Sequence, residues 1–186
     1  MYPTKYTNIS KKTLMSANVK GKALIIFHTA ELDSIDAERY PDLYTPNVRK
    51  LAEKAHDVLY IQAEDIPIGW SDKPESETPT MADFLAINDF LLKNHDREII
   101  AVCDAGIARS GFVTFFLDVM NDNFEGIGYM EDYDGGAIFV TGRRGIGSRR
   151  YFTNSALTTY MICRLDIITI ERLMKLRAII ERDTDT

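Results

Sequence analysis

Three short runs of apolar residues stand out along the chain, each separated from the next by a longer amphipathic stretch. The runs cover residues 23–27, 58–61 and 99–102, and they are rich in β-branched side chains without polar alternation. Continuous apolar runs of this length are typical of central strands in a parallel sheet that is covered on both faces. The pattern therefore predicts three buried parallel strands.

Helical spacing of apolar residues occurs between and after these runs. Residues 80–93 trace one apolar helical face that only Asn88 interrupts, and residues 110–120 repeat the spacing. The other expected helices cover residues 45–55, 155–165 and 168–180. The alternation of strands and helices predicts an α/β fold, with a central, mostly parallel sheet flanked by helices.

The domain organisation follows from what the chain lacks. No internal repeat or shift in composition divides it, so we expect a single domain over residues 1–186. Glycine-rich residues 134–136 and 141–147 indicate an irregular segment between helices.

Composition narrows the class of protein. The net charge of −6 argues against broad nucleic-acid binding, which needs a basic face. Two cysteines are too few for a disulfide framework in a chain of 186 residues. No run approaches the roughly 20 apolar residues of a membrane span. We therefore expect a cytoplasmic protein with free thiols and no membrane association, and we see no spacing of Cys and His that suggests a metal.

The segment CDAGIARS carries the candidate chemistry, because it follows the third apolar run and precedes an expected helix. Backbone N–H groups at such a helix N-terminus bind a phosphate dianion, and the helix dipole adds to the attraction. Gly106 permits the positive φ of a tight anion-binding loop. The expected phosphate-binding residues are Asp104, Ala105, Gly106, Ile107, Ala108 and Arg109.

Three side chains of this segment suit phosphoryl transfer through a thiolate. Cys103 is the candidate nucleophile, and the field of the loop favours its ionised form. Arg109 offers a planar fork that holds two phosphoryl oxygens, which a lysine does not. Ser110 can donate a hydrogen bond to the sulfur as the sulfur leaves. The alternative is a buried structural cysteine, with Arg109 paired to a carboxylate.

The spacing of a Cys, five residues, an Arg and a Ser resembles the signature of the cysteine-based protein tyrosine and dual-specificity phosphatases. CDAGIARSG is especially similar to small bacterial and phage members. The resemblance implies that family's fold, a phosphocysteine mechanism without metal or cofactor, and a loop that carries a general-acid aspartate. Val102 departs from the pattern, because most members have His before the cysteine.

The acid is expected on a loop after the run at residues 58–61. Asp65 is the first choice, because its position before an Ile resembles the small bacterial members. Asp72 is the alternative, because its distance from Cys103 along the chain is nearer to that in the dual-specificity enzymes. Glu64 is a third, weaker candidate.

The expected activity is hydrolysis of phosphate monoesters, on phosphotyrosine and phosphoserine or phosphothreonine in proteins. Two alternatives stay open at this point. One keeps the loop and changes the substrate to an RNA 5′-phosphate or a small molecule. The other is a phosphate-binding module without turnover, in which the loss of the His has left the thiol poorly activated.

Overall fold

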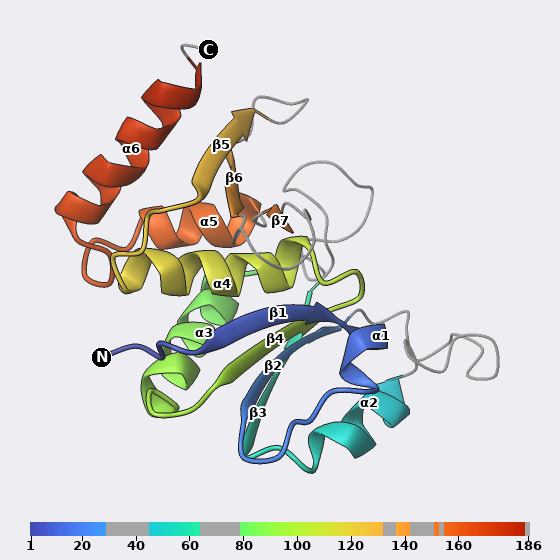
Figure 1. The fold of residues 1–186 in the computed structure, drawn as a ribbon. Coiled ribbons are helices and arrows are strands. Elements are labelled where there is room, and N and C mark those ends of the chain that lie inside the picture. Colours follow the sequence, from blue (N-terminus) through green and yellow to red (C-terminus); the bar gives the residue numbers. More distant parts are fainter. Residues whose placement is uncertain (29–44, 64–78, 132–136, 142–150, 153–154, 185–186) are drawn as a thin grey trace.

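A four-stranded parallel sheet forms the centre of the protein, in a computed structural model that describes residues 1–28, 45–63, 79–131, 137–141, 151–152 and 155–184 (Figure 1). The strand order is β1-β4-β2-β3, and every neighbouring pair is parallel. The strands are β1 (Tyr6–Ser10), β2 (Ala23–His28), β3 (Asp57–Gln62) and β4 (Ile99–Cys103). The three strands predicted from apolar runs are present as β2, β3 and β4. The expectation of burial on both faces is wrong for β3, because it lies at the edge of the sheet and only its Ile61 is buried.

The two faces of this sheet are covered by different helices. Alternate side chains of β2 enter separate cores, with Leu24 and Ile26 on one face and Ile25 and Phe27 on the other. The first face packs against α1 (Lys11–Leu14) and α2 (Thr45–Ala52), and the second against α3 (Met81–Lys93) and α4 (Ala108–Met120). The expected α/β fold, a parallel sheet flanked by helices, is therefore confirmed.

Local sequence explains where α3 begins. The Thr80 hydroxyl accepts a hydrogen bond from the Asp83 amide at 3.2 Å, and the Asp83 carboxylate accepts one from the Thr80 amide at 2.7 Å. This reciprocal capping box satisfies two amides at the helix start. The helix then runs to Lys93, as the apolar spacing predicts.

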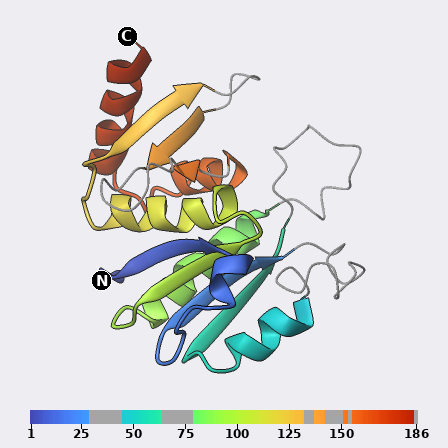
Figure 2. The same cartoon turned by 45° about the vertical axis from the view of Figure 1, so that its right-hand side comes forward.

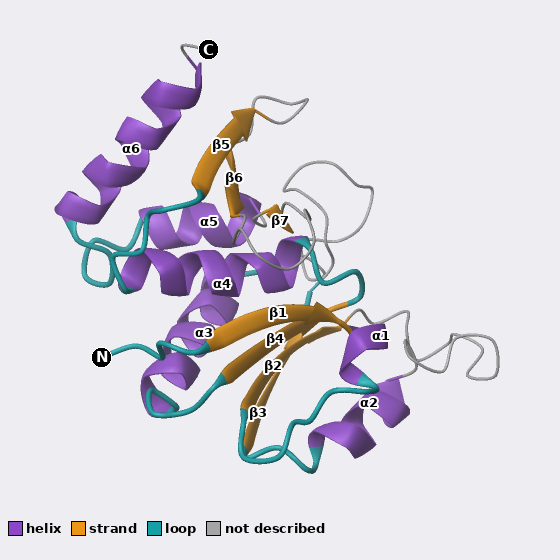
Figure 3. Ribbon diagram, viewed as in Figure 1, coloured by secondary structure: helices purple, strands orange, loops and turns teal. Residues whose placement is uncertain are grey.

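A second layer lies on the side of α4 away from the parallel sheet (Figures 1 and 2). It contains a small antiparallel sheet with the strand order β5-β6-β7 and two further helices (Figure 3). Its elements are β5 (Ile127–Glu131), β6 (Ala137–Thr141), β7 (Tyr151–Phe152), α5 (Ser155–Ile162) and α6 (Ile170–Thr184). Since α4 is enclosed between the two layers, every residue from Arg109 to Met120 is buried.

Strands occupy part of the interval in which residues 134–136 and 141–147 indicated an irregular segment, and of those residues the structure describes only Thr141, at the end of β6. The chain between α4 and α5 forms β5, β6 and β7, and Phe139 of β6 stacks on Phe115 of α4 with ring centroids 4.9 Å apart. Residues 132–136 and 142–150 lie outside the described residues. The stacked ring of Phe139 therefore packs β6 against α4.

Among the helices of the described residues, none combines the length and the apolar character that crossing a membrane requires.

Candidate active site

The segment that contains Cys103 lies at the carboxyl ends of two neighbouring strands. In the register of β1 and β4, Ser10 is the partner of Cys103. The chain leaves β1 into α1 on one face of the sheet, and it leaves β4 into α4 on the other face (Figure 2). A point where neighbouring parallel strands connect to opposite faces is where α/β proteins commonly bind ligands.

Gly106 holds the loop between β4 and α4 against the end of β1. Its φ is +72°, and a Cβ at this position would lie 2.5 Å from the Ser10 nitrogen and 2.6 Å from the Ile9 carbonyl carbon. The Asn8 side-chain amide donates to the Gly106 carbonyl at 2.9 Å. Only glycine suits both the conformation and the close approach, so β1 and the loop fix each other's position.

The loop leads directly into the N-terminus of α4. The N-cap residue is Ile107, whose side chain makes no capping hydrogen bond, and the first turn contains no acidic residue. Helices normally use such side chains to satisfy their first amides and to offset the positive end of the dipole. An uncapped start is suited to binding an anion from outside the chain.

The Cys103 side chain lies on the sheet face that packs against α4, and the residue is only 1% exposed. Its Sγ is 3.1 Å from the Oγ of Ser110, which is in the first turn of α4 and fully buried. The sulfur therefore sits between the end of a strand and the start of a helix, in hydrogen-bonding contact with a hydroxyl.

Arg109 is almost completely buried, and both terminal nitrogens of its guanidinium donate hydrogen bonds. Its Nη1 donates to the Ala63 carbonyl, directly after β3, at 2.6 Å, and its Nη2 donates to Asp104 Oδ2 at 2.5 Å. The buried Nε has no hydrogen-bond partner among the described residues. A buried donor without a partner is costly, so Nε is available to an oxygen that enters the site.

Asp104 also contacts a residue that the sequence did not indicate. The Nζ of Lys11, the first residue of α1, is 2.6 Å from Asp104 Oδ1, and the Lys11 side chain is 1% exposed. Burial raises the pKa of Asp104, but Arg109 and Lys11 lower it by more, so the carboxyl stays ionised below its usual range. Burial lowers the pKa of Lys11, and Asp104 only partly offsets this effect.

The candidate residues of the segment all lie at this strand end, in the loop or in the first turn of α4: Cys103, Asp104, Ala105, Gly106, Ile107, Ala108, Arg109 and Ser110. Val102 faces the opposite side of the sheet, in the core that contains Leu14 and Val19. The acid candidates Asp65 and Asp72 lie outside the described residues, as does Glu64. The described part of the chain holds no group of three or more Cys, His, Asp or Glu side chains that suits a metal ion.

Comparison of the chain with protein-family models, with curated proteins and with solved structures finds no match. Functional inference therefore rests on the geometry of this segment.

Proposed function

We propose that the protein is a phosphatase that hydrolyses phosphate monoesters through a phosphocysteine intermediate on Cys103. The observation that carries the proposal is the meeting of three groups around one uncapped helix N-terminus. These are a thiol in contact with the Ser110 hydroxyl, the guanidinium of Arg109, and a loop that Gly106 holds against the end of β1. The fold and the loop agree with the resemblance to the cysteine-based tyrosine and dual-specificity phosphatases.

In the first step, the thiolate of Cys103 attacks phosphorus in line with the ester oxygen. An S–P bond forms and the P–O bond breaks, while the loop amides and Arg109 hold the equatorial oxygens. The leaving oxygen takes a proton from a carboxylic acid, for which Asp65 is the first candidate and Asp72 the alternative.

In the second step, water attacks the phosphocysteine and gives its proton to the same carboxylate. The new P–O bond releases inorganic phosphate, and the S–P electron pair returns to the sulfur. The Ser110 hydroxyl, 3.1 Å from that sulfur, stabilises the departing thiolate by a hydrogen bond.

We propose phosphorylated proteins as the substrate class, with phosphotyrosine and phosphoserine or phosphothreonine as the target groups. An RNA 5′-phosphate or a small phosphorylated molecule is the alternative for the same loop chemistry. Side-by-side turnover of a phosphotyrosine peptide, a phosphoserine peptide and a 5′-phosphorylated oligoribonucleotide separates these substrates, since chemistry at phosphorus is common to all three.

The experiment that tests the activity is hydrolysis of a small aryl phosphate across pH, with and without vanadate. The wild type should turn over and vanadate should inhibit it, while Cys103→Ser should be inactive. Cys163→Ser is the matched control, because Cys163 is exposed and directly follows α5, outside the segment CDAGIARS. Phosphate binding without turnover would instead support the binding module, and substantial turnover by Cys103→Ser would exclude the mechanism.

A further inference from the structure

Two buried cations share one carboxylate beside the loop. Lys11 and Arg109 are 1% and 3% exposed, and both contact Asp104, whose side chain is 28% exposed. Each cation uses a different oxygen, with Lys11 on Oδ1 and Arg109 on Oδ2. The Asp104 carboxylate thus bridges α1 and α4 at the same strand ends that carry Cys103.

The Asp104 carboxylate contacts the Arg109 guanidinium, which in the proposed function binds the phosphoryl group of the substrate. The Asp104 carboxylate accepts one hydrogen bond from Nη2 of Arg109, while Nε has no partner among the described residues. A phosphoryl group that binds through Nε uses Nη2 as its second donor in a bidentate pair, and its negative charge opposes that of the carboxylate already on Nη2. The Asp104 carboxylate and an incoming phosphate therefore compete for the same nitrogen.

Lys11 provides a second cation for Asp104 when Arg109 binds a phosphate. A carboxylate released from Arg109 without another cation would be left partly buried and unpaired, which is strongly unfavourable. Lys11 already holds the other oxygen at 2.6 Å, so Asp104 keeps a counter-charge when Arg109 turns to the ligand. The contact needs no movement of α1, since Lys11 directly follows Ser10, the partner of Cys103 in the sheet register.

We propose that Lys11 is a positioning residue of the anion site. Lys11 keeps its ion pair with Asp104 when a phosphate group replaces Asp104 on Arg109. In the empty site, Asp104 is the counter-ion of both cations. This inference rests on the proposed function only for the choice of phosphate as the ligand.

The inference is tested by isothermal titration with inorganic phosphate, which measures affinity without turnover. Lys11→Met removes the charge and keeps the length of the side chain, and it should weaken phosphate binding about tenfold, the equivalent of one charge-assisted hydrogen bond. Asp104→Asn removes the competing anion and should tighten binding by about threefold or more. In the double variant the weakening should disappear, because Asp104 no longer holds Arg109.

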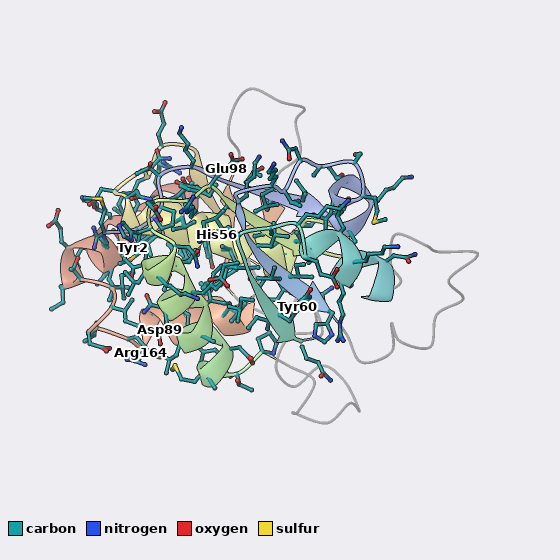
Figure 4. All side chains as sticks on the ribbon, turned by 90° about the horizontal axis from the view of Figure 1, so that it is seen from below. Tyr2, His56, Tyr60, Asp89, Glu98 and Arg164 are labelled. Carbon is teal, nitrogen blue, oxygen red and sulfur yellow. The ribbon has the colours of Figure 1, made fainter. Side chains whose placement is uncertain are left out.

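Lys22→Met is the matched control. Lys22 forms an ion pair of similar length with Glu98, 2.8 Å, at the opposite ends of the strands (Figure 4 labels Glu98). Phosphate affinity should not change in this variant. A change as large as that in Lys11→Met would mean that the loss of any lysine ion pair disturbs the site, and it would overturn the inference.

Weaker phosphate binding in Asp104→Asn overturns the inference, because the carboxylate would then assist the site instead of competing with it. A double variant as weak as Lys11→Met also overturns it, since Lys11 would act without Asp104. If Lys11→Met does not fold, Asp104→Asn alone decides by the direction of its effect.

The outcome is separable from that of the proposed function. The expected pattern of affinities without aryl phosphate hydrolysis would contradict the phosphatase and support the role of Lys11. Hydrolysis of the aryl phosphate together with weaker phosphate binding by Asp104→Asn would support the phosphatase and contradict the role of Lys11. Absence of phosphate binding in both the wild type and Asp104→Asn overturns the inference.

Discussion

The sulfur of Cys103 and the hydroxyl of Ser110 lie 3.1 Å apart, although one residue ends a strand and the other lies in the first turn of a helix. The contact is buried, so water does not compete for the hydroxyl. A hydroxyl at this position stabilises a thiolate more than the uncharged sulfur of a phosphocysteine. Its effect is therefore greatest when the sulfur leaves phosphorus.

We predict that Ser110→Ala slows the second step more than the first. The loss of one hydrogen bond to a charged group should lower kcat about tenfold. Rapid mixing with an aryl phosphate should show a burst of the phenol followed by slow turnover. Ser110→Thr keeps the hydroxyl and should retain most of kcat. An unchanged kcat in Ser110→Ala would exclude this role.

The acid assignment can be tested through the leaving group. Arg109 binds the carbonyl of Ala63, and Asp65 follows two residues later in the chain. Asp65→Ala should lower kcat about 100-fold or more for phenyl phosphate, because phenolate leaves poorly without a proton. The loss should be much smaller for an aryl phosphate whose phenol is strongly acidic.

Asp72→Ala is the matched comparison in the same assay. If it shows the larger, leaving-group-dependent loss, the acid is Asp72. Equal and small losses in both variants would mean that neither carboxylate protonates the leaving oxygen. Phosphate affinity should be preserved in the variant that lacks the acid.

Gly106→Ala should destabilise the fold more than another substitution of a glycine with positive φ. The new Cβ meets backbone atoms of β1 at 2.5 Å, so strain adds to the unfavourable φ, and we expect a loss of about 3 kcal/mol in the free energy of unfolding. Gly21 has a φ of +75°, and no heavy atom of the described residues lies within 4 Å of its Cβ position. Gly21→Ala should therefore cost about 1 kcal/mol. Urea denaturation of both variants measures the difference, and equal losses would contradict the close packing of the loop on β1.

The ion pairs of Asp104 predict how stability depends on pH. Burial raises the pKa of this carboxyl, but Arg109 and Lys11 bring it below the usual 3.8. A carboxyl whose pKa is lower in the folded protein stabilises the fold above its unfolded pKa, and this contribution disappears as pH falls through the folded pKa.

Asp104→Asn should therefore be less stable than the wild type at neutral pH, and the difference should shrink as the pH falls below about 4. Urea denaturation at several pH values gives the two curves. Glu125→Gln, at an exposed carboxyl, is the control and should follow the wild type. A difference that grows toward acid pH would contradict the ion pairs.

The fold could be predicted from the sequence in β2 and β4, where burial on both faces left continuous apolar runs, and β3 has a similar run although only its Ile61 is buried. β1 gave no such signal, because Tyr6–Ser10 is short and mostly polar. Its Asn8 is buried only because its amide binds the Gly106 carbonyl. That contact depends on tertiary structure and leaves no periodic trace in the chain.

The small antiparallel sheet was missed for another reason. Its strands are short and flanked by glycines, which read locally as a loop. The apolar, β-branched run of β6, Ala137–Thr141, is the signal that could have indicated it. What stabilises this run is Phe139 stacked on Phe115, a contact between distant segments.

In the candidate site too, the sequence indicates the residues that are close together along the chain but not those that tertiary structure brings together. Its local part, residues 103–110, could be recognised from spacing, and the roles of those residues stay predictions. Lys11 could not be found in this way, because only the pairing of Ser10 with Cys103 brings it to Asp104. Strand register between segments far apart in the sequence is not encoded in any local pattern.

The central claim is that phosphorus becomes bonded to the Cys103 sulfur during turnover, and rapid acid quenching tests it most directly. Wild-type protein is mixed with an aryl phosphate, quenched within the first turnover and digested for mass analysis. We expect a phosphoryl group on the peptide that contains Cys103, and no such peptide from Cys103→Ser. A phosphoryl group on any other residue, or hydrolysis without a phosphorylated peptide at any quench time, would contradict the account.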